Sequence, residues 1–171
     1  YGSFGIGSSS HLINAYLSES YQLGMSHVAY KGESPMVQDM LGGQIQVGIG
    51  TLGTLVPHIA TGALRALAVV GDQRLKELPN VPTMAEAGLR GAEYKLPAGL
   101  VMMAPAGTPA PVLARLEKEA RAAVQSAALK ARFQVYGLVG VGNSSADFRR
   151  NLEASGPIIQ KLIKVSGAKV E

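Results

Sequence analysis

The stretch that decides the fold is Ser3-Phe4-Gly5-Ile6-Gly7-Ser8-Ser9-Ser10, a glycine- and serine-rich turn. Residues 1–5 are expected to end a strand, and the apolar residues of 9–22 recur at the spacing of an amphipathic helix. A strand, a tight turn and a helix in this order are typical of an α/β unit. A helix that begins directly after such a turn exposes its first N–H groups, which favours binding of an anion.

The same alternation continues along the chain. Short apolar runs and helical patterns follow one another, punctuated by Gly and Pro, and this order predicts β-α units on a mainly parallel sheet. The expected strands cover residues 26–30, 45–49 and 64–70, and the expected helices between them cover residues 35–41 and 52–61.

The composition changes in residues 71–99, which are rich in Pro and Gly and predict a long, ordered connection. A short helix is expected at 83–87, where Thr83 and Glu86 have the spacing of a capping box. Beyond the connection we expect a strand at 100–104, helices at 109–125 and 127–136, a strand at 138–141, and a helix from Ser145 that Gly156-Pro157 kinks or breaks.

The composition excludes several classes of protein. Of the 171 residues 47% are hydrophobic and only 16% are charged, which is typical of a globular domain and not of a disordered tail or a coiled coil. No uncharged apolar stretch reaches the ~20 residues of a membrane helix. The net charge of +4 weakly favours anionic ligands.

The chemistry-bearing residues predict binding rather than catalysis. The chain has no Cys, and its three His, at 11, 27 and 58, lack the spacing of a helical metal pair. No nucleophile, base or carboxylate pair stands out, so we predict no enzyme activity, no metal and no cofactor.

The candidate ligand site begins at the glycine-rich turn. The missing Cβ atoms of Gly5 and Gly7 let a ligand approach the backbone at Ile6, and hydroxyl groups add donors for a carboxylate or phosphate. These hydroxyls belong to Ser3, Ser8 and Ser9. Ordinary helix capping explains the same residues equally well, because the spacing matches neither the P-loop nor the dinucleotide motif.

Two further candidates follow predicted strands. Lys31 comes after the strand at 26–30, and Gly50-Thr51 comes after the strand at 45–49. Open α/β sheets bind ligands at the carboxyl ends of their strands, although a solvated lysine explains Lys31 as well. We interpret His11 as a capping or packing residue and Glu33 as an ordinary residue at a helix start.

At these motifs the sequence resembles the Bug family of extracytoplasmic solute receptors, the substrate-binding components of tripartite tricarboxylate transporters. The resemblance runs along nearly the whole chain. Its most specific segments are Arg74-x-x-x-Leu78-Pro79-x-Val81-Pro82-Thr83-x-x-Glu86-Ala87-Gly88 and Ala104-Pro105-Ala106-Gly107-Thr108-Pro109. Further matching segments are Ser3-x-Gly5-x-Gly7-Ser8-x-x-His11-Leu12, Val28-Ala29-Tyr30-Lys31-Gly32, Gly43-Gln44-Ile45 and Pro57-His58-Ile59, followed by Gly62-Ala63-Leu64-Arg65-Ala66-Leu67-Ala68-Val69.

The resemblance implies an α/β fold of the periplasmic-binding-protein type II class, with two lobes that close on a small organic acid without a chemical step. Residues 1–99 are expected to form lobe two, the ligand-binding lobe. Residues 100–171 are expected to form the carboxyl-terminal part of lobe one. The chain is thus interpreted as an amino-terminally truncated receptor, one complete lobe plus part of the other, with its signal peptide outside these residues.

By position, the resemblance places the ligand contacts of lobe two at the turn Gly5-Ile6-Gly7-Ser8 and at Gly50-Thr51. The family commonly has Asp or Asn where Gly50 stands, and an aromatic pair near Gly99-Leu100. Because a carboxylate can accept a hydrogen bond from an amino group, Gly50 makes a simple amino-acid ligand less favoured.

The implied receptor is periplasmic. Its partners are a carboxylate ligand and the membrane components of the transporter, with no nucleic acid. The alternative is the effector-sensing domain of a LysR-like transcription regulator, which has a related fold and needs a DNA-binding helix pair upstream. We also expect the chain to self-associate as a dimer through apolar faces of residues 100–171, and to bind ligand poorly on its own.

Overall fold

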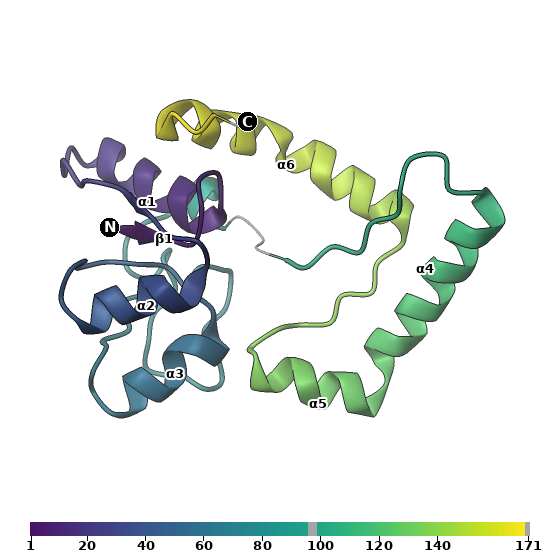
Figure 1. The fold of residues 1–171 in the computed structure, drawn as a ribbon, viewed down its shortest axis with the longest axis horizontal. Helices are drawn as coiled ribbons and strands as arrows, with labels where there is room; N and C mark the ends of the chain where they lie inside the picture. The colour runs from purple at the N-terminus through teal and green to yellow at the C-terminus, as the bar shows by residue number, and fades with distance from the viewer. Residues whose placement is uncertain (96–98, 170–171) are drawn as a thin grey trace. The chain divides into compact units, whose positions relative to one another are not determined.

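A computed structural model describes residues 1–95 and 99–169 of the protein (Figure 1). The chain divides into two compact units, one formed by Tyr1–Pro97 with Gly156–Glu171 and the other by Ala98–Ser155. Part of the predicted connection, residues 96–98, and the last residues of the segment predicted to belong to lobe one, 170–171, lie outside the described residues. The assignment of residues 1–99 and 100–171 to two receptor lobes stays a prediction.

The first unit is built around a short parallel sheet. Strand β1 (Gly2–Ser3) pairs with strand β2 (Val28–Ala29), with Gly2 opposite Val28. On its other edge Gly2 forms a parallel bridge with Gly48, and its N–H donates to the Val47 carbonyl at 2.9 Å. β1 is therefore the central segment, and the carboxyl ends of all three segments meet at one edge of the sheet.

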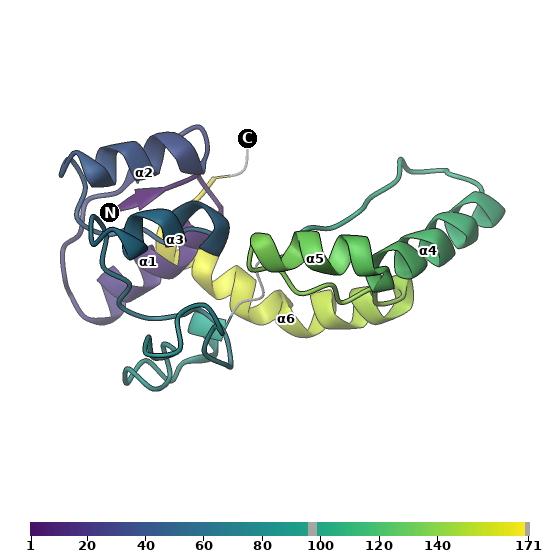
Figure 2. The same cartoon turned by 90° about the horizontal axis from the view of Figure 1, so that it is seen from below.

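Two helices cover this sheet and a third packs on one of them, all close to their predicted bounds. Helix α1 (Ser9–Ser20) and helix α2 (Glu33–Leu41) contact β1 from opposite sides, and helix α3 (Leu52–Ala60) contacts α2 (Figures 1 and 2). The prediction of α/β units in this region is thereby confirmed, and each helix begins at the carboxyl edge of the sheet.

The core of the first unit consists of three clusters of buried side chains. The α1 face forms one cluster and α2 forms another, while the third joins α1 to the end of the last helix. Their buried members are Ile13, Met84 and Tyr94 in the first, Met36, Val37 and Ile45 in the second, and Leu12 and Leu162 in the third. These clusters hold the sheet edge in place from both sides.

The strands predicted at 45–49 and 64–70 are wrong in extent, since each forms only a single bridge, at Gly48 and at Val69. Val69 donates to the Pro82 carbonyl and accepts from Met84, and Pro82 has no N–H with which to extend this pairing. The helix predicted at 83–87 is a turn. Its capping box does form, because the Thr83 N–H donates to the Glu86 carboxylate at 2.8 Å and the Glu86 N–H donates to the Thr83 hydroxyl at 3.2 Å.

The rest of the connection ends in a short 3-10 helix, η1 (Ala92–Lys95). Its Glu93 and Tyr94 are buried, and Tyr94 packs in the cluster of Ile13. The Glu93 carboxylate accepts a hydrogen bond from the Lys161 ammonium at 2.5 Å, which lowers the pKa of Glu93. Part of the connection is therefore held in the core of the first unit.

The second unit contains helix α4 (Ala110–Gln125), helix α5 (Ala127–Val135) and the beginning of helix α6 (Ser145–Ser166). The strands predicted at 100–104 and 138–141 are wrong: residues 99–155 as described contain no strand. A strand needs a neighbour that pairs with its backbone, and apolar sequence alone does not supply one.

Helix α6 is continuous through Pro157, so Gly156-Pro157 does not break it, and the kink that was the other expectation stays a prediction. A proline in a helix removes one backbone hydrogen bond and crowds the preceding turn. The residues that follow it offset this cost by packing: Leu162 is fully buried against Leu12, with Ile158 and Ile159 beside it. No helix among the described residues is long and apolar enough to cross a membrane.

Candidate ligand site

The glycine-rich turn after β1 has the open backbone that a ligand site requires. Gly5 and Gly7 have positive φ angles of 150° and 77°, a conformation that glycine adopts without strain. A Cβ atom built on either glycine meets no other atom within 4 Å. In the described part of the chain, the space directly beside these two glycines is therefore open.

Several of the predicted donors are already occupied within the turn. Ser3 is fully buried, and its hydroxyl lies 2.7 Å from Nε2 of His27 and 3.1 Å from the Gly5 carbonyl. Ser8 is the N-cap of α1: its hydroxyl donates to the Gly5 carbonyl at 2.6 Å and accepts from the His11 N–H at 3.3 Å. These two hydroxyls hold the turn in shape, as the capping interpretation expects.

Two stacked histidines lie against the turn. Nδ1 of His11 accepts a hydrogen bond from the Gly7 N–H at 3.1 Å, so this nitrogen is unprotonated. The rings of His11 and His27 stack with their centroids 3.9 Å apart, and Tyr1 stacks on His27. Burial lowers the pKa of both histidines, and for His27 protonation of the neighbouring His11 and the charged amino terminus lower the pKa further. The sequence predicted a capping or packing role for His11 but did not reveal its stacking on His27.

Three backbone donors remain at the start of α1. In the part of the chain that the structure describes, the N–H groups of Ile6, Ser9 and Ser10 donate to no acceptor, and of these residues Ser10 is fully buried. The Ile6 side chain is 64% exposed, so it offers an apolar contact at the tip of the turn. The predicted site thus reduces to the Ile6 and Ser9 backbone, the Ser9 hydroxyl and the positive end of the α1 dipole.

The second predicted contact, Gly50-Thr51, is occupied by a side chain that sequence reasoning set aside. The carboxylate of Glu33, at the start of α2, accepts a hydrogen bond from the Thr51 N–H through Oε1 and from the Thr51 hydroxyl through Oε2, the latter at 2.8 Å. A Cβ atom on Gly50 would lie 2.5 Å from Oε1 of Glu33. The Glu33 carboxylate therefore occupies the space that the missing side chain of Gly50 leaves. The sequence did not reveal this contact, because the two residues are 17 positions apart in the chain.

Lys31 lies on the chain between β2 and α2, at the same edge of the sheet. It is exposed, and in the described part of the chain no carboxylate lies within 4.0 Å of its ammonium group. Its role in ligand binding stays a prediction.

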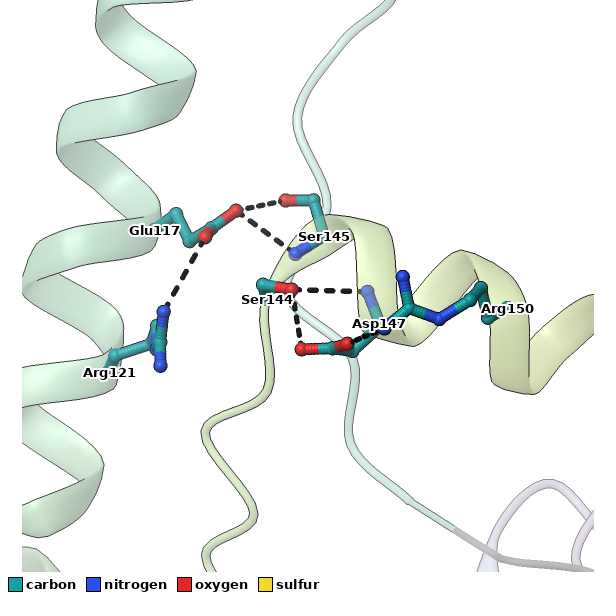
Figure 3. Close-up of polar contacts among 6 residues, drawn as sticks. All are labelled: Glu117, Arg121, Ser144, Ser145, Asp147 and Arg150. Carbon is teal, nitrogen blue, oxygen red and sulfur yellow. Dashed lines mark hydrogen bonds and ion pairs between the residues drawn. The ribbon is translucent and has the colours of Figure 1, made fainter.

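Polar groups also gather in the second unit, where they cap α6 (Figure 3). The Ser144 hydroxyl accepts from the Asp147 N–H at 3.1 Å, and Glu117 of α4 accepts from the Ser145 N–H at 3.0 Å. Hydrogen bonds from these serines lower the pKa values of Asp147 and Glu117. Each group serves the helix start, so this cluster is a cap and not a ligand site.

The described residues contain no group of three or more His, Cys, Asp or Glu side chains that could hold a metal ion. The polar groups at the sheet edge consist of backbone N–H groups, hydroxyls, one ammonium and one carboxylate. Such a set is chemically suited to hydrogen bonds and charge interactions with a small polar molecule.

Comparison with known proteins identifies the family. Residues 1–164 match the family model described as tripartite tricarboxylate transporter family receptor. The chain belongs to this family of receptors. Among its curated relatives is the protein BugT of Bordetella pertussis (strain Tohama I), which is 33% identical over 136 residues, covering 80% of this chain and 41% of BugT.

Two solved structures have the same fold. The periplasmic binding protein BugD aligns with a TM-score of 0.82 and 28% identity over 99% of this chain and 57% of its own. The R. palustris protein Rpa4515 with adipate aligns with a TM-score of 0.81 and 28% identity, covering 98% of this chain and 56% of that protein. The prediction of a periplasmic-binding-protein-like α/β fold is thereby confirmed. The chain spans about half the length of the curated relatives it matches.

Proposed function

We propose that this chain forms part of an extracytoplasmic receptor that captures a small organic carboxylate in the periplasm. The receptor would pass its ligand to the membrane components of a tripartite tricarboxylate transporter. The family, a family of receptors and not of enzymes, supports this proposal, as does the likeness to the periplasmic binding protein BugD. The same family match supports the receptor over the alternative of a LysR-like effector domain.

One observation supports placing the ligand at the glycine-rich turn. The N–H groups of Ile6 and Ser9 are unpaired at the start of α1, beside the open face of Gly5 and Gly7. Backbone donors at a helix start are suited to a carboxylate, because their hydrogen bonds and the helix dipole both favour negative charge. The turn follows the central segment of the sheet, and the chain crosses over to both sides of it. Ligands of open α/β sheets bind at such a point.

The relatives support a carboxylate as the ligand class. Rpa4515 has been solved with adipate, an aliphatic dicarboxylate, and its structure aligns along 98% of this chain. The binding event involves no bond making or breaking, so no catalytic group, metal or cofactor is needed. The affinity would come from charge-assisted hydrogen bonds, at about 1.5–3 kcal/mol each.

The decisive variant is Ser9→Pro in the full-length natural protein. Ser9 is the first residue of α1, a position at which proline fits a helix, and Ser8 has the φ of −65° and ψ of 159° that a following proline prefers. The variant therefore removes one N–H donor without disturbing the helix. We expect carboxylate affinity, measured by calorimetry, to fall about tenfold or more.

Ser9→Ala is the matched control, because it removes the hydroxyl but keeps the N–H group. The probe is adipate, the dicarboxylate present in the Rpa4515 structure. If Ser9→Pro binds it as tightly as the parent and Ser9→Ala do, the start of α1 is not the carboxylate clamp.

A further inference from the structure

The end of the sheet at Gly50-Thr51 presents a negatively charged hydrogen-bond acceptor, whereas its sequence predicts hydrogen-bond donors for an anion. A strand end that leads into a helix normally offers N–H and hydroxyl donors to an anion. Here both donors of Thr51 are used by the Glu33 carboxylate, and the Thr51 hydroxyl in turn lies 3.1 Å from that of Thr54. This edge of the sheet therefore presents an acceptor with a negative charge.

The packing around Glu33 holds the carboxylate in that place. Its two oxygens each accept a hydrogen bond from Thr51, and the space that they occupy exists because Gly50 has no side chain. In the described part of the chain no Lys, Arg or His nitrogen lies within 4.0 Å of this carboxylate. Its charge is thus uncompensated by a side chain, and each oxygen retains a lone pair for a further donor.

The topology places Glu33 next to the proposed ligand site. The glycine-rich turn follows β1, Glu33 follows β2, and Gly50 follows the segment that bridges to Gly2. Because these segments are parallel neighbours with β1 between the other two, their carboxyl ends lie along the same edge of the sheet. A ligand held at the turn by one carboxylate extends along an edge at which Glu33 and the exposed Lys31, two residues before it, provide further polar contacts.

We propose that Glu33 determines the specificity of the receptor, by selecting a carboxylate ligand whose other end is a hydrogen-bond donor. Hydroxy- and amino-carboxylates would satisfy the free lone pairs of Glu33. A dicarboxylate would bring a second negative charge towards it, at a cost in Coulomb energy and desolvation. This inference rests on the proposed function and names the class of ligand for the same site.

The test is a comparison of matched ligands on the full-length natural protein. The probes are two series of equal chain length that differ at one end: succinate, γ-hydroxybutyrate and γ-aminobutyrate, and adipate, ε-hydroxycaproate and ε-aminocaproate. Calorimetry gives the affinity ratio of the donor-ended ligand to the dicarboxylate. We expect that ratio to exceed about tenfold in the parent protein in at least one series.

Two variants test the residue itself. Glu33→Gln removes the charge at nearly constant size, and Gly50→Ala places a Cβ atom against Oε1 of Glu33 and so displaces the carboxylate. We expect each variant to lower the ratio about tenfold, while Glu19→Gln, the same charge change at the far end of α1, leaves it unchanged. Far-ultraviolet circular dichroism confirms that the variants fold.

The outcomes separate the two proposals. If the parent protein binds members of the panel but neither Glu33→Gln nor Gly50→Ala alters the affinity ratio of the donor-ended ligand to the dicarboxylate, the role of Glu33 is overturned and the receptor function stays intact. A preference of the parent for both dicarboxylates overturns it as well. A parent that binds no member of the panel contradicts the proposed carboxylate receptor.

Discussion

The two units of the chain carry the same kind of apolar pattern but bury it differently. In the first unit Ile13 of α1 is 1% exposed, whereas Leu116 of α4 in the second unit is 42% exposed. Every described residue that counts as buried belongs to the first unit, and residues 99–155 as described have none. Helical periodicity therefore identifies an apolar face without telling what covers it.

The polar groups of the two units differ in the same way. In the first unit Glu93 is buried with the Lys161 ammonium beside it, and Ser3 and His11 are buried under the glycine-rich turn. In the second unit the polar contacts are helix caps and exposed ion pairs, such as that of Arg150 with Asp147. A buried carboxylate such as that of Glu93 needs its partner, because leaving it unpaired is costly, whereas exposed pairs contribute little.

The largest expected effect concerns the uncovered face of the second unit. Val112, Leu113 and Leu116 are each more than 40% exposed, and such apolar surface normally finds a partner. We predict that this chain dimerises with a micromolar dissociation constant, which corresponds to about 8 kcal/mol. Light scattering during size-exclusion chromatography would give about twice the mass of the 17.8 kDa chain.

Leu116→Lys is the variant that links this dimer to the α4 face, since a charge in the interface should return the chain to a monomer. A parent that stays monomeric at every concentration and unfolds cooperatively would contradict the prediction.

The next largest effect is expected when one leucine side chain in each unit is shortened to alanine. Leu162→Ala removes a fully buried side chain packed on Leu12 and should lower the free energy of unfolding by about 2–5 kcal/mol. Leu116→Ala removes the same atoms from an exposed position, and its effect on a monomeric sample should stay within about 0.5 kcal/mol. Urea denaturation followed by circular dichroism compares the two, and equal losses would show that the second unit has a core of its own.

A smaller effect is expected from the histidine pair as the pH falls. The pKa values of His11 and His27 are lowered in the folded state, so below their ordinary value of 6.5 the unfolded chain binds more protons than the folded one. The free energy of unfolding should therefore keep its whole contribution from the two histidines above pH 6.5. It should decrease as the pH falls through the pKa values that the histidines have in the folded state. Urea denaturation at a series of pH values measures this slope.

His11→Asn tests the origin of that slope, because the asparagine oxygen can accept the Gly7 N–H in place of Nδ1 without titrating. The slope should become shallower in this variant and stay unchanged in His58→Gln. Identical slopes for all three proteins would assign the acid sensitivity to other groups.

The smallest effect concerns the cap of α6 in the second unit (Figure 3). Ser144→Ala removes the hydroxyl that accepts from the Asp147 N–H, and loss of such a cap costs about 1 kcal/mol. Ser144→Asn should retain most of the stability, because asparagine also caps helices. Thermal unfolding followed by circular dichroism separates them, and an unchanged midpoint for Ser144→Ala would mean that Glu117 alone holds the start of this helix.

The sequence by itself determined the helices and the class of fold. The bounds of α1, α2 and α3 follow from apolar spacing and from Gly and Pro, which act within a few residues of one another along the chain. The family resemblance, carried by motifs such as Leu78-Pro79-x-Val81-Pro82-Thr83, was likewise available from order and spacing alone.

Only the tertiary structure decided which groups are free to act. Pairing decided that residues 100–104 and 138–141 are not strands, and packing on Leu12 decided that α6 continues through Pro157. Contacts across the sheet decided that Ser3 is buried beside His27 and that Glu33 occupies the donors of Thr51. The physical reason is that a hydrogen-bond donor is available to a ligand only if no other part of the protein has already accepted from it, and those acceptors lie far away in the sequence.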